Sequence, residues 1–189
     1  MNKWSRIASG KIIPDYQKLT EATNGLRAIG RAIVVTIGSW DGLHVGHVRY
    51  LKKAKEKGDV LVVGADSDKA IRDYKGPTRP IVNQLERMEL LSHLDCVDLV
   101  TIVSDVDKKG RWRYGLIRAI RPDVFVAVRG SYPKKQLAEI GKFCERVIVL
   151  PRQAKGTSTS GYIERTLRFH LEEMLNALGG GNKDQEQKK

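Results

Sequence analysis

The chain has 189 residues, of which 41% are hydrophobic, enough for one compact domain with a core of its own. Lys and Arg outnumber Asp and Glu by 34 to 22, and the net charge of +12 favours anionic partners such as nucleotides, phosphorylated metabolites, nucleic acid or acidic lipid headgroups. Two widely separated cysteines argue against a disulfide framework or a cysteine-based metal site, and no apolar stretch is long enough for a transmembrane helix.

The predicted elements begin with a helix. Residues 1–30 show helical periodicity after Pro14, which predicts an amphipathic N-terminal helical extension, and residues 1–10 lack the apolar region of a signal peptide. We therefore expect a cytoplasmic protein that does not associate with membranes. From residue 31 to 178, strands alternate with helices. The strands are predicted at 32–37, 60–64, 99–103, 124–128 and 147–150, and the helices at 46–57, 68–74, 83–93, 112–120, 134–143 and 159–178.

This alternation predicts the fold class. The strands are nearly continuous runs of Val, Ile and Leu, which is typical of strands buried on both faces. We expect an α/β fold: a Rossmann-like, doubly wound, parallel five-stranded sheet in the order 3-2-1-4-5, with helices on both faces. The domain would span 31–178. Three consecutive glycines predict that the last helix stops at Gly179, and that 179–189 form a disordered tail.

The strand order predicts where a ligand binds. In such sheets ligands lie outside the carboxyl ends of the strands, where the order reverses. The loops that follow the first, fourth and fifth strands, residues 38–47, 129–132 and 152–160, should therefore face one pocket.

The first of these loops lies in the sequence IVVTIGSWDGLHVGHV, residues 33–48. Gly38 and Gly42 let a phosphate approach the main chain, and a helix beginning near Gly46 offers unpaired amides. His44 and His47 are three residues apart, so both imidazoles can reach one group above the first helical turn. That arrangement suits a phosphoryl group. A zinc site is the weaker alternative, because no third ligand is apparent nearby, and a purely structural histidine pair is another.

The stretch GSWDGLHVGH resembles the signature of the cytidylyltransferase-like (HxGH) nucleotidyltransferase superfamily. A second stretch, PRQAKGTSTS, is similar to the family's second signature, an Arg followed by Gly-Ile-Ser-Thr-Thr. Between the two, residues 66–68, 75–80, 86–87, 97–98 and 121–124 are similar to the nucleotidyltransferase domain of ADP-heptose synthase, and glycerol-3-phosphate cytidylyltransferase is a near relative. The resemblance covers roughly residues 34–165.

The resemblance implies attack of an acceptor phosphate on the α-phosphorus of ATP or CTP, with Mg²⁺ accompanying the triphosphate and pyrophosphate leaving. It implies a homodimer and a phosphorylated small-molecule acceptor. From the residues themselves we expect no protein-bound metal site and no nucleic-acid partner. The implied catalytic residues are His44, His47 and Lys75. The implied nucleotide-binding residues are Ile37, Gly38, Ser39, Trp40, Gly46, Arg129, Gly130, Arg152, Ser158, Thr159 and Ser160. The implied acceptor-binding residues are Asp66, Arg87 and Asp41, although Asp41 is expected chiefly to shape the turn.

Two departures from the family pattern concern the substrate. Relatives read Lys-Gly-Gly-Asp-Tyr where this chain has Val-Arg-Gly-Ser-Tyr, so Ser131 stands at an acidic position. The second signature carries one extra residue before Gly156, and Thr157 replaces the usual isoleucine. The base and the acceptor therefore stay open.

Rival functions remain. An adenylyltransferase for FMN, pantetheine phosphate or nicotinamide mononucleotide would share these motifs. The charge favours a non-catalytic nucleotide or nucleic-acid binder, although no basic patch interleaved with aromatic residues supports one. An aminoacyl-tRNA synthetase fragment would share the HxGH-type turn. The synthetase chain would be far longer, however, and would carry a second, lysine-rich signature. Lys75, Arg87 and Arg152 could also be solvated surface side chains.

Overall fold

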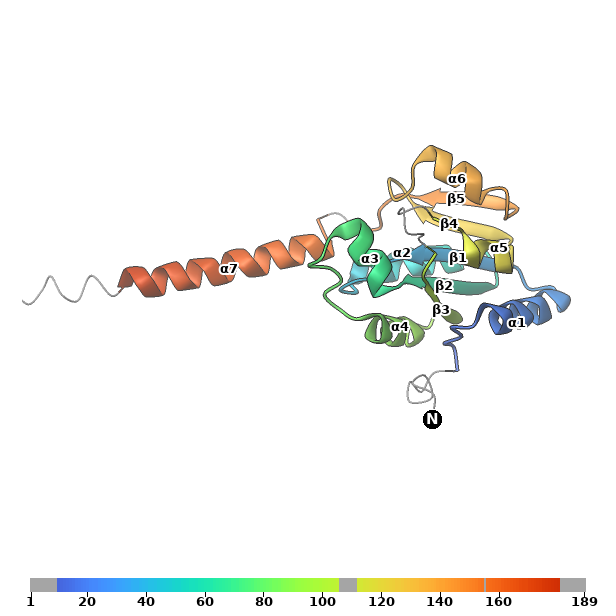
Figure 1. Ribbon diagram of the computed structural model, residues 1–189, viewed down its shortest axis with the longest axis horizontal. Helices are drawn as coiled ribbons and strands as arrows, with labels where there is room; N and C mark the ends of the chain where they lie inside the picture. The colour runs from blue at the N-terminus through green and yellow to red at the C-terminus, as the bar shows by residue number, and fades with distance from the viewer. Residues whose placement is uncertain (1–9, 106–111, 155, 181–189) are drawn as a thin grey trace, which may run out of the picture. The chain divides into compact units, whose positions relative to one another are not determined.

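The computed structural model describes residues 10–105, 112–154 and 156–180, and the chain divides into two units, residues 1–154 and 155–189. The first unit contains a five-stranded parallel sheet in the order β3-β2-β1-β4-β5 (Figure 1), which confirms the predicted order. The strands are β1 (Ile33–Gly38), β2 (Val60–Asp66), β3 (Leu99–Val103), β4 (Val124–Val128) and β5 (Arg146–Leu150).

The helices of the first unit are α1 (Tyr16–Ala28), α2 (Val45–Lys55), α3 (Asp68–Lys75), α4 (Gln84–Ser92), α5 (Gly115–Ile120) and α6 (Lys134–Ile140), and α7 (Thr159–Gly180) belongs to the second. All the predicted helices are present, although several of their ends differ by one to three residues, and two of these differences have a physical reason. Helix α5 begins at Gly115 rather than 112, because Tyr114 has a φ of 57° and cannot continue a right-handed helix. The prediction that Gly179 stops the last helix is wrong: α7 runs through Gly180, since glycine permits a left-handed stop without forcing one.

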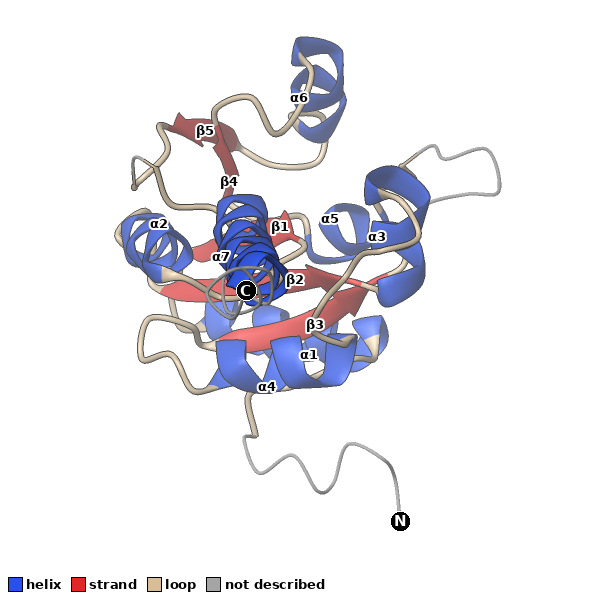
Figure 2. Ribbon diagram, turned by 90° about the vertical axis from the view of Figure 1, so that its left-hand side faces the viewer, coloured by secondary structure: helices blue, strands red, loops and turns tan. Residues whose placement is uncertain are grey.

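Helices cover both faces of the sheet, as predicted (Figure 2). The apolar residues of α2 and α4 pack on one face, where Leu51 and Met88 are fully buried. Those of α1, α5 and α6 pack on the other, where α1 contributes Leu19. The N-terminal helix is therefore part of the core of the first unit. Of the predicted tail, residues 181–189 lie outside the described residues.

Two carboxylates hold the strands together at the edge of the sheet where the strands begin. Asp98 accepts a hydrogen bond from the backbone N–H of Leu61 at 2.6 Å, and Asp123 accepts one from that of Ile33 at 2.6 Å. Strand starts present N–H groups that carboxylates satisfy well. The family-like residues around 97–98 and 121–124 thus stabilise the fold at the edge opposite the candidate site.

None of the described helices combines the length and apolar character that crossing a bilayer requires. Cys96 and Cys144 are both free thiols.

Gly64 provides a test of how tightly β2 packs. A Cβ at this position would lie 2.7 Å from Val103 Cγ2 and 2.9 Å from Leu116 Cδ2. Gly64→Ala should therefore lower the free energy of unfolding by about 1–3 kcal/mol in urea unfolding. Gly25, exposed within α1 with open space around it, is the matched control, and Gly25→Ala should raise stability by about 0.5–1 kcal/mol. Equal urea-unfolding midpoints for Gly64→Ala and the unmodified chain would contradict the close packing described for this position.

Candidate functional site

The two histidines lie at the start of α2, in the loop after β1. His44 is the N-cap residue, and its imidazole Nδ1 accepts a hydrogen bond from the backbone N–H of Gly46 at 3.1 Å. Because Nδ1 accepts, the neutral ring carries its proton on Nε2. The rings of His44 and His47 stack with centroids 3.8 Å apart and planes 19° apart. The three-residue spacing thus brings both imidazoles together above one helix N-terminus.

Close packing at the start of α2 requires Gly46 to lack a side chain. A Cβ at Gly46 would lie 3.0 Å from the His44 ring and 3.2 Å from Ala154 Cβ. Gly46 therefore lets the His44 imidazole fold back onto the first turn of α2. Gly46 thus places His44 in two ways: it leaves room for the imidazole, and its backbone N–H donates to the His44 Nδ1 atom.

Trp40 anchors the same loop to the sheet. Its indole N–H donates to the carbonyl of Gly64 in β2 at 2.9 Å, and its ring is buried against Tyr50 and the edge of His47. Its φ of 50° is a left-handed conformation that a tryptophan adopts at a cost. Burial and the indole hydrogen bond offset that cost, so Trp40 supports the wall beside His47.

Burial keeps both imidazoles neutral. It lowers the pKa of His44, and it lowers the pKa of His47 to about 4, with His44 and Lys75 adding to the effect and Asp41 opposing it. The Nδ1 atom of His47 is buried and has no hydrogen-bond partner among the described residues. Near pH 7 the pair therefore offers neutral N–H donors to a ligand rather than two positive charges.

Lys75, at the end of α3, reaches the loop after β1. Its Nζ donates a hydrogen bond to Ser39 Oγ at 2.7 Å. Burial is the main cause of a lowered Lys75 pKa, with Arg79 adding to it and Asp41 and Asp66 opposing it. The structure thus brings the predicted catalytic lysine into contact with the predicted nucleotide-binding serine.

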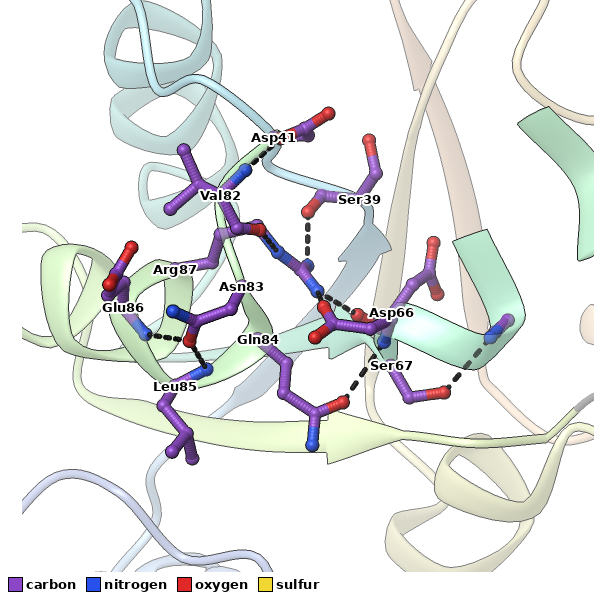
Figure 3. Close-up of polar contacts among 12 residues, drawn as sticks. Ser39, Asp41, Asp66, Ser67, Val82, Asn83, Gln84, Leu85, Glu86 and Arg87 are labelled. Atoms are coloured by element: carbon purple, nitrogen blue, oxygen red, sulfur yellow. Dashed lines mark hydrogen bonds and ion pairs between the residues drawn. The ribbon is translucent and has the colours of Figure 1, made fainter. Parts of the chain in front are cut away.

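Arg87 lies at the centre of the polar network beneath this loop (Figure 3), with 1% of its surface exposed. Its guanidinium donates to the carbonyls of Val82, Ser39 and Asp66 and pairs with the Asp68 carboxylate at 2.7 Å. These contacts join the ends of β1 and β2 to the start of α3 and to the segment before α4.

Asp41 fixes the loop from a second direction. Its Oδ1 accepts hydrogen bonds from the N–H groups of Ile81 and Val82 at 2.9 and 3.0 Å, and its Oδ2 lies 2.8 Å from Arg79 Nη2. The carboxylate is fully buried, and these contacts support the turn-shaping role expected for it.

Asp66, the last residue of β2, carries an unusual carboxylate. Oδ2 accepts a hydrogen bond from the Tyr74 hydroxyl at 2.7 Å, whereas Oδ1 is buried without a hydrogen-bond partner among the described residues. Burial raises the pKa of Asp66 to about 6, although the Tyr74 hydrogen bond and the charges of Arg87 and Lys75 act in the opposite direction. The acceptor contacts expected for Asp41, Arg87 and Asp66 stay predictions; all three side chains are buried and bind protein groups.

Other predicted residues lie at the carboxyl ends of the strands. The backbone carbonyl of Ile37 accepts a hydrogen bond from the Tyr132 hydroxyl at 3.2 Å. Arg129 is exposed, and its backbone N–H donates a hydrogen bond to the carbonyl of Leu150 at 2.8 Å. The next residue, Gly130, has a φ of 84°. Arg152, after β5, is also exposed.

The second predicted signature belongs to the second unit. Ser158 caps the first turn of α7, where its Oγ accepts from the N–H of Gly161 at 3.0 Å, and Thr159 and Ser160 begin the helix. The histidine loop belongs to the first unit, so the predicted meeting of this turn with that loop stays a prediction.

Sequence reasoning did not single out Tyr74, Tyr132 or the side-chain role of Arg79. The family resemblance covers Arg79 and Tyr132 without indicating their contacts, and each of the three acquires its partner only through the tertiary fold. Within the described part of the chain, no three His, Cys, Asp or Glu side chains gather as a metal site.

Comparisons with known proteins agree on one family. The cytidylyltransferase-like family model matches residues 35–165. The chain is similar to the bifunctional protein HldE of Nitratiruptor sp., with 37% identity over 155 residues, 82% of this chain and 32% of that protein. It is also similar to HldE of Wolinella succinogenes, with 42% identity over 139 residues, 74% of this chain and 28% of that protein. The chain thus spans about a third of the length of these curated relatives.

Two solved structures share the fold. The lipopolysaccharide core biosynthesis protein of Thermoplasma volcanium is 27% identical, with a TM-score of 0.53 over 67% of this chain and 98% of that one. Pantoate-beta-alanine ligase of Francisella tularensis is 19% identical, with a TM-score of 0.56 over 82% of this chain and 72% of that one. The second likeness concerns the fold alone.

The raised pKa of Asp66 predicts that this residue destabilises the protein at neutral pH. Its folded-state pKa of about 6 lies above the ordinary 3.8, so the native protein gains stability as the pH falls through 6 and loses it as the pH rises. Asp66→Asn cannot ionise and can still accept from Tyr74. It should therefore be more stable than the unmodified chain by up to about 3 kcal/mol above pH 7, and this advantage should vanish by about pH 4.

Urea unfolding of both proteins at several pH values measures this difference. Asp73→Asn, on the exposed side of α3, is the control and should change stability by less than about 0.5 kcal/mol throughout. A stability difference for Asp66→Asn that does not vary with pH would contradict the prediction.

Proposed function

The chain belongs to the cytidylyltransferase-like family of nucleotidyltransferases, and we propose that it transfers AMP or CMP from a nucleoside triphosphate to a sugar- or polyol-phosphate, with release of pyrophosphate. The observation that carries this proposal is the stacked His44–His47 pair at the N-terminus of α2. Two neutral N–H donors and a helix N-terminus suit a phosphate whose charge grows as a bond breaks.

In the proposed reaction, an acceptor phosphate oxygen forms a bond to the α-phosphorus while the bond from that phosphorus to the bridging oxygen of the β-phosphate breaks. The electron pair leaves with pyrophosphate. His44, through Nε2–H, and His47 stabilise the α-phosphate and the leaving group, and Lys75 beside Ser39 neutralises the developing charge.

The remaining nucleotide contacts follow the family resemblance. Ile37, Gly38, Ser39, Trp40 and Gly46 shape the loop that receives the triphosphate, and Arg129, Gly130 and Arg152 contribute from the ends of β4 and β5. Ser158, Thr159 and Ser160 hold the β- and γ-phosphates at the start of α7. Mg²⁺ enters with the triphosphate, bound to its oxygens, as part of the substrate.

The acceptor is proposed to be a heptose-1-phosphate or a glycerol-3-phosphate type of molecule. The similarity to HldE and to a lipopolysaccharide core biosynthesis protein supports the sugar phosphate. Asp41, Arg87 and Asp66 would act on it by holding the surrounding loops, because their side chains are bound to protein groups.

We propose that the protein works in the cytoplasm, because its two free thiols fit a reducing compartment.

We also propose that the working form is a homodimer. Within the second unit, Leu167, Leu171, Met174 and Leu178 follow a spacing of four, three and four residues along α7, a stripe that one helix cannot bury. Light scattering of the chain should give twice its monomer mass. A monomeric mass at micromolar concentration would overturn this part of the proposal.

The test of the activity is pyrophosphate release with Mg²⁺ and each of ATP, CTP, GTP and UTP, measured against a panel of sugar and polyol phosphates, FMN and pantetheine phosphate. We expect release with ATP or CTP and a sugar or polyol phosphate. Release with FMN or pantetheine phosphate alone would favour a cofactor-precursor adenylyltransferase. Nucleotide binding without release in any pair would favour a non-catalytic binder.

The histidine variants provide the matched control. His44→Ala and His47→Ala should each lower kcat by at least about 10²-fold with the fold intact, because each loses a donor to the transition state. His170→Ala, which removes an exposed histidine of α7, should leave kcat unchanged. Full pyrophosphate release by the His44/His47 double variant would rule out the proposed mechanism.

A further inference from the structure

Tyr74 and Lys75 are consecutive residues at the end of α3, and their side chains bind the ends of two neighbouring strands. The Tyr74 hydroxyl donates to Asp66 Oδ2, at the end of β2, at 2.7 Å. Lys75 Nζ donates to Ser39 Oγ, just after β1, at 2.7 Å. The last turn of α3 is thus held at two points, one at the end of β2 and one just after β1.

Lys75 is the last residue of its helix. The next residue, Gly76, has a φ of 96°, so the helix ends there and the chain turns away. A lysine side chain at a helix end has four rotatable bonds, and one hydrogen bond to a serine hydroxyl restrains it weakly. Its position therefore depends on how firmly the backbone of the last turn is held.

The Tyr74 ring supplies further restraint. Lys75 Nζ lies 5.7 Å from its centroid, and the Trp112 ring is tilted by 50° against it with centroids 6.0 Å apart. Removing only the hydroxyl would leave these ring contacts in place. The effect of the hydroxyl can therefore be measured separately from that of the ring.

Asp66 explains why the hydroxyl matters. Its carboxylate is buried, one oxygen lacks a hydrogen-bond partner among the described residues, and Arg87 binds its backbone carbonyl rather than its side chain. Burying a carboxylate in this way destabilises the fold. The one hydrogen bond described for this carboxylate is the one from Tyr74, so this bond is what ties the last turn of α3 to the Asp66 side chain.

We propose that the Tyr74 hydroxyl is a positioning group for Lys75: by bonding Asp66, it fixes the last turn of α3 and keeps the Lys75 amino group beside Ser39 at the loop that receives the triphosphate. This inference rests on the proposed function, in which Lys75 acts on the transferring phosphate. Tyr74 itself need not touch the substrate.

The kinetic test compares Tyr74→Phe, Lys75→Ala and the double variant. Tyr74→Phe should lower kcat about 10-fold and change the KM for the nucleotide little, because a small misplacement of a catalytic group acts on the transition state. In the Lys75→Ala background the same substitution should have no further effect, because the group that it positions is gone. Tyr16→Phe, which removes a hydroxyl bonded to the Ile102 carbonyl, is the control and should keep kcat.

A second measurement needs no activity. Acylation of lysines by an N-hydroxysuccinimide ester, followed by mass spectrometry, should modify Lys75 faster in Tyr74→Phe than in the unmodified chain, relative to the exposed Lys53. Tyr16→Phe should leave that ratio unchanged. Thermal unfolding confirms that each variant is folded.

The outcomes separate the two proposals. No pyrophosphate release by the unmodified chain overturns the proposed function, and the acylation ratio then decides the positioning inference alone. A loss of kcat in Lys75→Ala that Tyr74→Phe does not share, or two losses that multiply in the double variant, overturns the positioning inference and leaves the proposed function standing. An unchanged kcat in Lys75→Ala overturns the role of Lys75 and with it the positioning inference.

Discussion

The candidate site depends on one buried guanidinium. Strands β1 and β2 are paired in parallel through Gly38 and Ala65, so their ends lie side by side. Arg87 binds the carbonyl that follows each pair, those of Ser39 and Asp66, and it also holds Val82 and the Asp68 carboxylate. A buried charge is costly unless its donors are satisfied, and here three carbonyls and a carboxylate satisfy them. The spacing of the loops around the site follows from this contact.

Burial keeps the two histidines of the site neutral. Two arginines that contact the loop or its aspartate are themselves paired, Arg87 with Asp68 and Arg79 with Asp41. A neutral N–H donor binds a ground-state phosphate less tightly than a fixed cation does, but its hydrogen bond strengthens as negative charge develops. In the proposed reaction, such donors would favour the transition state without retaining the pyrophosphate product.

The sequence was sufficient to predict the sheet and the histidine pair, because both depend on local patterns. Runs of Val and Ile mark buried parallel strands, and a spacing of three residues places His44 and His47 on one side of a helical turn. It was not sufficient to predict that Arg87 is buried or that Asp66 bonds Tyr74. These contacts join residues 8 to 48 positions apart in the chain, and they exist only once the strands and helices have packed.

The two edges of a parallel sheet explain why Asp66 needs Tyr74. At the edge where the strands begin, free N–H groups satisfy carboxylates, and Asp98 and Asp123 are bound there by the backbone. At the opposite edge the strands end in carbonyls, which attract an arginine and repel a carboxylate, and this is where Arg87 lies. Asp66 is a carboxylate at this second edge, so its described hydrogen bond comes from a side-chain hydroxyl rather than from the sheet. Burial raises the pKa of this carboxylate. The same hydrogen bond attaches α3, with Lys75 at its end, to the site.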